Sequence, residues 1–281
     1  ASVPLNGGRP VHYECRPDRG FLPDAANIER LVTARTRAIV LINPNNPTGA
    51  VYPESLLREI AELAERHELV VMADEIYDEM TYDGAKFVPM ATLVNNTLCI
   101  TYSGLSKVYR ACGYRVGWCS LSGTAQDNRS YIDGLELLAA LRLCSNVPSQ
   151  WAVQTALGGY QSIHELTTPG GRLHQTRQAV IDSVARSPWL TLVVPQGSMY
   201  AFVGVDTAAF PDFDDEAFAF RLLEEQHVLL APGSSFNTPY RNHFRITLLP
   251  EPEQMAEVFA RINTVLEAMH ADLARPAAVG D

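Results

Sequence analysis

Short apolar runs alternate along the first half of the chain with segments in which apolar residues recur at helical spacing. The runs at 37–42, 69–73 and 97–101 are rich in aliphatic residues, which predicts three buried strands. After Pro53, apolar residues recur every three or four positions, which predicts a helix between the first two strands. Because parallel strands need a crossover connection, this alternation indicates an α/β fold with a mostly parallel sheet.

The second half of the chain has a different order of elements. Residues 130–162 predict helices with broad apolar faces, and Thr168-Pro-Gly-Gly171 then interrupts the pattern. Beyond it we predict helices at 172–185, 215–226 and 252–270, and strands at 190–194, 199–203, 228–230 and 243–248. This order indicates a smaller α+β domain, so we divide the chain into a large domain, 1–166, and a small domain, 167–281. The tail after Arg275 is expected to be disordered.

Composition excludes several classes of function. The 281 residues carry a formal net charge of -10 and contain no basic tract, which argues against a nucleic-acid partner. No apolar run approaches the roughly 20 residues of a membrane span. The five cysteines are scattered and lack CxxC spacing, as expected of reduced thiols in a cytoplasmic protein. The seven histidines form no HxxxH or HExxH cluster, so we expect no metal site.

Lysine is scarce in this chain. Of the 22 lysines and arginines, only Lys86 and Lys107 are lysines. Arginine does not lose its proton near neutral pH and so cannot act as an amine nucleophile. Any chemistry that needs a free amine must therefore use one of these two side chains. Lys86 follows the turn signal Tyr82-Asp-Gly84, and we expect it to be exposed.

Each of the three predicted strands leads into a distinctive polar cluster. The clusters lie at 43–49, 74–77 and 103–107, and Arg110 and Arg115 follow the last one. Singly, each has an ordinary explanation: a turn, a helix cap and a solvated lysine. Ligands of α/β sheets bind outside the carboxyl ends of the strands, so three clusters at consecutive strand ends favour a binding site.

The clusters also carry a resemblance to a known family. The stretches NPNNPTGAVY, ADEIYDEMTYDG, SGLSKVYRACGYRVGW and HFRITLLP resemble the class I/II aminotransferases of pyridoxal phosphate (PLP) fold type I. The match runs nearly end to end and is strongest with bacterial glutamate–pyruvate (alanine) aminotransferases. The resemblance implies PLP as cofactor, an amino acid and a 2-oxo acid as substrates, and a homodimer with its site at the interface. Alanine with 2-oxoglutarate is the expected substrate pair.

The resemblance assigns roles to five residues of the clusters. Lys107 would bind the cofactor covalently and later move a proton at the substrate. Asp74 would pair with the protonated ring nitrogen of PLP. Tyr77 and Asn46 would bond the 3′ oxygen of the cofactor, and Asn46 would also reach the substrate carboxylate. Arg115 would hold the phosphate.

Arg245 has two readings. Its neighbours Phe244 and Ile246 point to one face of a predicted strand, so Arg245 points to the other, which could simply be solvent. In the family, an arginine in this setting binds the substrate α-carboxylate through its planar fork. The resemblance therefore makes Arg245 the substrate-binding arginine, with Tyr200 as a further candidate to line the site.

Two departures from the family pattern affect the phosphate site. Many relatives have Ser or Thr three residues before the lysine, where this chain has Gly104. Ser103 and Ser106 are both candidates to bind the phosphate in its place. The match also begins partway into the large domain, so we expect the family's N-terminal portion to be missing and these 281 residues alone to be a poor enzyme.

Two rival functions are a C–S β-lyase on the same scaffold and a non-catalytic PLP-binding or regulatory module.

Overall fold

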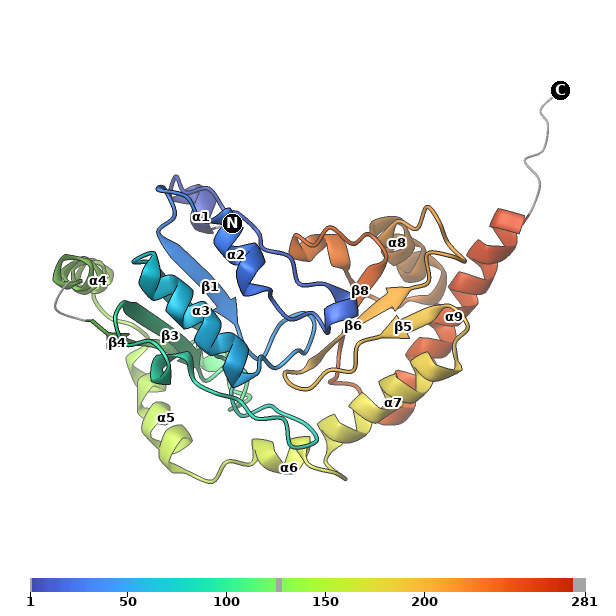
Figure 1. Cartoon of the computed structure of the whole chain (residues 1–281). Helices are drawn as coiled ribbons and strands as arrows, with labels where there is room; N and C mark the ends of the chain where they lie inside the picture. The colour runs from blue at the N-terminus through green and yellow to red at the C-terminus, as the bar shows by residue number, and fades with distance from the viewer. Residues whose placement is uncertain (1, 125–127, 275–281) are drawn as a thin grey trace. The chain divides into compact units, whose positions relative to one another are not determined.

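A computed structural model describes residues 2–124 and 128–274 (Figure 1). The chain forms two compact units, and each is described here by itself. The first unit comprises residues 1–46, 50–165 and 196–198, and the second comprises 47–49, 166–195 and 199–281. The tail beyond Arg275, which the sequence predicts to be disordered, lies outside the described residues. No helix within the described ranges is long and apolar enough to cross a membrane.

The first unit follows the predicted alternation of strands and helices. Its elements are α1 (Ser2–Leu5), η1 (Pro17–Arg19), α2 (Ala25–Leu31), β1 (Ala38–Ile42), α3 (Glu54–Arg66), β2 (Val70–Asp74), η2 (Met90–Thr92), β3 (Leu98–Gly104), η3 (Cys112–Tyr114), β4 (Gly117–Gly123), α4 (Arg129–Arg142) and α5 (Val147–Gly158). The short helix α6 (Ile163–Thr167) leads on toward the second unit along the chain.

The sheet of the first unit has the order β1-β2-β3-β4. Strand β2 pairs in parallel with β1 and with β3, whereas β4 returns antiparallel to β3. The α/β class and the mostly parallel sheet predicted from the sequence are therefore confirmed. The sequence did not predict β4, whose residues are mostly exposed and give no apolar run.

Helix α3 lies along one face of this sheet (Figure 1). Its buried side chains recur at helical spacing and are Leu57, Ile60, Ala61, Leu63 and Ala64. Pro53 stands at its N-cap, because the fixed φ of proline and its missing N–H suit the start of a helix. Burying an aliphatic side chain of this size stabilises a fold by roughly 1.5–3 kcal/mol, so α3 anchors the sheet that carries the strand-end clusters.

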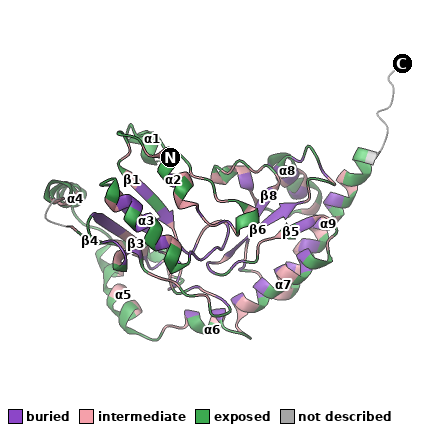
Figure 2. Cartoon of the chain, viewed as in Figure 1, coloured by how far each residue is buried: buried purple, intermediate pink, exposed green. Residues whose placement is uncertain are grey.

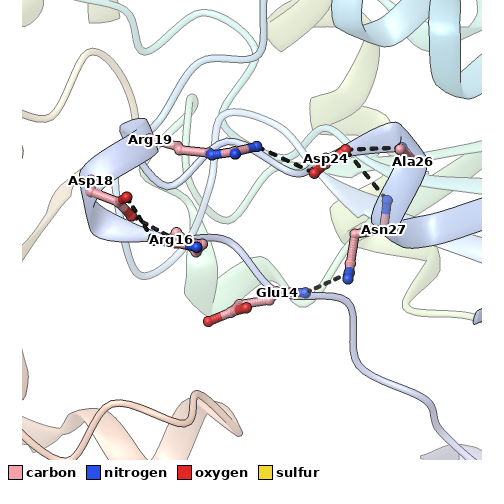
Figure 3. A network of polar contacts seen from close by, with 7 residues as sticks. All are labelled: Glu14, Arg16, Asp18, Arg19, Asp24, Ala26 and Asn27. Carbon is pink, nitrogen blue, oxygen red and sulfur yellow. Dashed lines mark hydrogen bonds and ion pairs between the residues drawn. The ribbon is translucent and has the colours of Figure 1, made fainter. Parts of the chain in front are cut away.

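Polar contacts order the segment that precedes α2 (Figure 3). The guanidinium of Arg16 donates two hydrogen bonds to Asp18, at 2.9 and 2.7 Å. Asp24 accepts from the backbone at the start of α2, at 2.9 Å from Ala26 N, and is 3.3 Å from the guanidinium of Arg19. An Asp N-cap is worth about 1 kcal/mol, whereas exposed ion pairs contribute less.

Helices α4 and α5 form at the predicted place but bury no side chain in the described structure. Figure 2 shows both helices as mostly exposed, with some intermediate residues and none buried. Their large apolar side chains with at least half of the surface exposed are Leu137, Leu138, Leu141, Val147, Trp151 and Leu157.

The second unit is an α+β arrangement. Its elements are α7 (Arg172–Arg186), β5 (Leu190–Leu192), β6 (Tyr200–Val205), α8 (Asp215–Gln226), β7 (Ala231–Pro232), η4 (Gly233–Phe236), β8 (His243–Thr247) and α9 (Pro252–Ala274). The sheet order is β5-β6-β8-β7 and every pairing is antiparallel. Strand β6 is buried along its whole length.

One predicted strand of this unit is wrong. The sequence predicted a strand at 228–230, but the pairing with β8 begins only at Ala231. Val228 N instead bonds back to Leu222 O, at 3.5 Å, at the end of α8. The first residues of this apolar run therefore belong to the C-terminal end of α8, and the strand begins after them. Leu229 is exposed.

The pairing of β3 with β4 requires glycine at its last position. Gly104 lies opposite Gly117. A Cβ on Gly104 would lie 2.8 Å from Val116 O and 3.0 Å from Gly117 Cα, both of which are backbone atoms. Backbone atoms beside a paired strand cannot move aside cheaply, so a side chain at this position requires the neighbouring backbone to shift.

We therefore expect Gly104→Ala to destabilise the protein by about 1–3 kcal/mol, the usual cost of overpacking. The matched control is Gly113→Ala, because a Cβ there meets no atom within 4 Å. Denaturant unfolding of both variants measures the difference. A loss at Gly104 no larger than that at Gly113 would contradict the clash.

Candidate active site

The carboxyl ends of β1, β2 and β3 lie side by side. The parallel register places Ile42 beside Asp74, and Asp74 beside Tyr102. The ladder continues past the strand ends, since Asn43 N donates to Asp74 O and Glu75 N donates to Tyr102 O, each at 3.0 Å. The polar clusters that follow the three strands therefore leave the sheet from one edge.

The loop after β1 is held by its own asparagines. Asn43 is buried, and its Oδ1 accepts a hydrogen bond from Tyr52 N at 2.9 Å. Asn45 Nδ2 donates to Tyr52 Oη at 3.0 Å, and Asn45 N donates to Ala50 O at 2.8 Å. These bonds fix the backbone on both sides of Asn46, which is half-buried.

Asp74 is half-buried at the end of β2. Its Oδ1 accepts a hydrogen bond from Ile76 N at 3.2 Å, but burial dominates and raises the pKa of the carboxyl above its usual range. Within the described ranges, no cationic side chain forms an ion pair with it. A cation placed against Asp74 would favour the carboxylate, so this position suits a cationic ligand group.

Tyr77 lies one turn beyond Asp74. The turn is closed by hydrogen bonds from Asp78 N to Glu75 O, at 3.1 Å, and from Met80 N to Tyr77 O, at 2.8 Å. The ring of Tyr77 is buried, with only 3% of its surface exposed. The turn therefore holds the backbone of Tyr77 close behind Asp74.

The loop after β3 carries Lys107. Leu105 N donates to Val116 O at 3.0 Å, and Ala111 N donates to Leu105 O at 2.9 Å. Arg110 N closes a turn on Lys107 O at 3.0 Å. These bonds hold Lys107 in a fixed, half-buried place, whereas Lys86 is exposed as expected.

The residues predicted to bind a phosphate lie around this loop. Ser103 and Ser106 are both half-buried, and they flank Gly104–Leu105, where the family's hydroxyl residue is replaced by glycine. Arg115 stands two residues before Gly117, so it lies at the same sheet edge. Its side chain is exposed, and its Nη1 donates to Cys112 O at 2.8 Å.

Arg245 belongs to the second unit, in β8. The buried side chains of Phe244 and Ile246 flank it in sequence, as the alternation predicted. Arg245 itself is half-buried, and its Cζ lies over the rings of Tyr200, at 4.3 Å, and Phe236, at 4.9 Å. Its guanidinium therefore lies against aromatic rings, and the simple solvent reading does not describe it.

The structure thus places seven predicted residues in the last residues of β2 and β3 or in the loops that follow at one edge of the first sheet, and Arg245 in the second unit. It also adds two residues that the sequence analysis did not single out. Phe236 covers Arg245, and Glu75 is a buried carboxyl directly after Asp74. Their signals were an aromatic residue in a Ser-rich turn and a second acidic residue at a strand end. Among the described residues, no group of three His, Cys, Asp or Glu side chains is placed to hold a metal ion.

Comparison with known proteins identifies the family. The profile described as "Aminotransferase class I and II" matches residues 1–262. The chain belongs to the class I and II aminotransferases. This assignment confirms the family that the strand-end motifs indicated, and enzymes of this family use PLP.

Individual class I and II aminotransferases are closely similar to this chain. The glutamate-pyruvate aminotransferase AlaA of Escherichia coli is 45% identical over 270 residues, which are 96% of this chain and 67% of that protein. The alanine aminotransferase of Mycobacterium tuberculosis is 44% identical over 266 residues, 95% of this chain and 62% of that protein. The crystal structure of an aminotransferase from Escherichia coli has a TM-score of 0.93 at 45% identity, covering 96% of this chain and 67% of that one. The chain thus spans about two thirds of the length of these relatives.

The residues of the first unit fit PLP chemically. Asp74 offers a half-buried carboxyl that lacks a cationic partner within the described chain, as a protonated ring nitrogen needs. Lys107 offers an amine in a loop closed by hydrogen bonds. Ser103, Ser106 and Arg115 supply hydroxyl and cationic groups of the kind that hold a phosphate.

Glu75 generates a prediction about pH. It accepts a hydrogen bond from Met90 N at 2.7 Å, but burial, with smaller contributions from Asp78 and Asp74, raises its pKa from 4.5 to about 7. The folded state therefore binds this proton more tightly than the unfolded state. The stabilisation is complete below about pH 4.5 and is lost as the pH rises through about 7.

We expect Glu75→Gln to be more stable than the natural protein at pH 8, by an amount on the order of 1–3 kcal/mol, and to match it near pH 4. Glutamine keeps an oxygen that can accept from Met90 N. Urea unfolding at several pH values measures the difference, and a gap that is constant with pH would rule out titration of Glu75.

Proposed function

We propose that this chain transfers an amino group from alanine to 2-oxoglutarate, giving pyruvate and glutamate. The observation that carries the proposal is the half-buried Lys107 at the same sheet edge as Asp74. The substrate pair is supported by the names of the relatives, which are alanine and glutamate-pyruvate aminotransferases. Because the chain spans only about two thirds of those proteins, the activity is proposed for the whole protein to which this chain belongs.

Each site residue has a proposed task. When bound, PLP supplies an electron-accepting ring that stabilises negative charge at the substrate Cα. Asp74 keeps the ring nitrogen protonated by offering a carboxylate. Lys107 would hold the cofactor through its amine, and the same amine, when free, would move a proton at the substrate Cα. Tyr77 and Asn46 donate to the cofactor's 3′ oxygen.

The remaining contacts set position rather than reactivity. Ser103, Ser106 and Arg115 would hold the phosphate through hydroxyl and charge-assisted hydrogen bonds. Arg245 binds the substrate α-carboxylate, with Asn46 as a second donor.

The wider organisation follows the same proposal. Residues 1–166 form the PLP-binding large domain and 167–281 the small domain, which is supported by the division of contacts near residue 165. The protein is a homodimer with its site at the interface, and it acts in the cytoplasm. The five free cysteines support a reducing compartment.

Chemical trapping tests the central residue. Borohydride reduction of the protein loaded with PLP should leave a stable adduct on Lys107 alone, because Lys86 is exposed and outside the site. Peptide mass mapping locates the adduct. Lys86→Ala should keep the adduct and Lys107→Ala should lose it. An adduct on Lys86 with none on Lys107 would refute the assignment.

Release of ammonia and pyruvate from a thioether substrate, without amino transfer, would indicate the β-lyase reaction instead.

Steady-state kinetics test the carboxylate contact. Arg245→Lys should raise the KM for alanine at least 10-fold and leave PLP affinity within a factor of two, because lysine keeps the charge but loses the planar fork. A lost charge-assisted bond of about 1.5–3 kcal/mol corresponds to roughly 10- to 100-fold. Arg261→Lys is the matched control, since Arg261 makes an exposed ion pair with Glu257. An unchanged KM for both substrates would remove Arg245 from the site.

A further inference from the structure

The aromatic contacts of Arg245 come from two different kinds of element. Tyr200 lies on β6 and is fixed by the sheet, where it pairs with Thr247. Phe236 lies at the end of η4, a turn of only four residues. The place of the Phe236 ring therefore depends on whatever holds η4.

Acidic side chains at the start of α8 hold this turn and the chain beyond it: Asp215 and Glu216 contact the turn itself, and Asp214 contacts the chain beyond it. Asp215 Oδ2 accepts from Ser234 N at 2.5 Å, and Glu216 Oε1 accepts from Ser234 Oγ at 3.1 Å. The Asp215 side chain is completely buried, so its bond to the turn is shielded from water. Ser234 is thereby tied to α8 by both its backbone and its hydroxyl.

The same acidic residues hold the chain beyond η4. Arg241 Nη2 lies 2.9 Å from Asp214 Oδ2, and Arg241 Nε lies 3.4 Å from Asp215 Oδ1. At the other end, Gly233 packs so closely on β8 that a Cβ there would lie 2.7 Å from His243 O. The segment 233–241 is thus fixed at both ends.

Phe236 is also held from the side of the sheet. Its ring meets Phe202 edge to face, with centroids 6.1 Å apart. Phe202 is the register partner of Arg245 across β6 and β8, and it stacks on His243 at 5.0 Å. The Phe236 ring is therefore restricted in two ways: its backbone is held in η4, and its ring packs against Phe202.

A planar guanidinium binds a carboxylate best when its N–H edge is aimed at both oxygens, and aromatic rings against its faces restrict its rotation without competing for those N–H groups. We propose that Phe236, held by the Asp215–Ser234 contact, is a positioning residue that orients Arg245 for the α-carboxylate. This rests on the proposed role of Arg245 in substrate binding. The ring contributes through the orientation of Arg245 and not through contact with the reacting atoms.

The test compares variants of Phe236 with and without an aromatic ring. Phe236→Met and Phe236→Leu remove the ring and keep an apolar side chain, whereas Phe236→Tyr keeps the ring. The KM for alanine should rise about 3- to 10-fold in the Met and Leu variants, with kcat within a factor of two, and should stay near the natural value in the Tyr variant. Asp215→Asn, which weakens the hold on η4, should change KM in the same direction.

A double-mutant cycle separates positioning from general stability. If Phe236 acts through Arg245, Phe236→Met should have no further effect on KM in an Arg245→Lys background. Calorimetric affinity for 2-methylalanine, which binds but has no α-hydrogen to lose, should show the same pattern, while thermal unfolding midpoints report stability separately.

The outcomes distinguish this inference from the proposed function. A KM effect of Phe236→Met that is equal in both backgrounds, or that follows the unfolding midpoint instead of the presence of a ring, would overturn the positioning role. A large effect of Arg245→Lys with none from the Met and Leu variants would overturn it and leave the carboxylate contact standing. No effect of Arg245→Lys would overturn both.

Discussion

The parallel register of β1, β2 and β3 is the constraint on which the candidate site depends. It sets Ile42, Asp74 and Tyr102 in one row, and the backbone bonds of Asn43 and Glu75 extend that row past the strand ends. A shift of two residues in β2 would keep its side chains on the same faces but would move the carboxylate about 7 Å along the sheet. The buried apolar runs that fix the register therefore also fix the chemistry at the edge.

Much of this arrangement could be predicted from the sequence because two strong signals agree. Three apolar runs each lead into a polar cluster, and strand ends in parallel sheets share an edge. The scarcity of lysine then reduced the amine candidates to two, and a turn signal beside Lys86 left Lys107. In the structure Lys86 is exposed and Lys107 is half-buried. Motif resemblance added the roles of the neighbouring residues, which local patterns alone could not supply.

The features that the sequence could not predict depend on distances between segments far apart in the chain. The raised pKa of Glu75 comes mainly from its burial, and the sequence does not show which segments of the chain bury it. The contact of Phe236 with Arg245 joins a short turn to a strand, and no spacing rule connects them. Strand β4 escaped detection because most of its residues are exposed and its sequence, with two glycines and two serines, lacks the apolar run that marks a buried strand.

The glycine at 104 also bears on how such a site can change during evolution. A hydroxyl cannot be gained there by one substitution, since the backbone of the opposite strand occupies the space that its Cβ would need. Acquiring it would require the backbone near Val116 and Gly117 to shift, at a cost in stability. Hydroxyl groups are already present on either side, at Ser103 and Ser106. In this structure a hydroxyl for the phosphate is therefore supplied more readily from position 103 or 106 than from position 104.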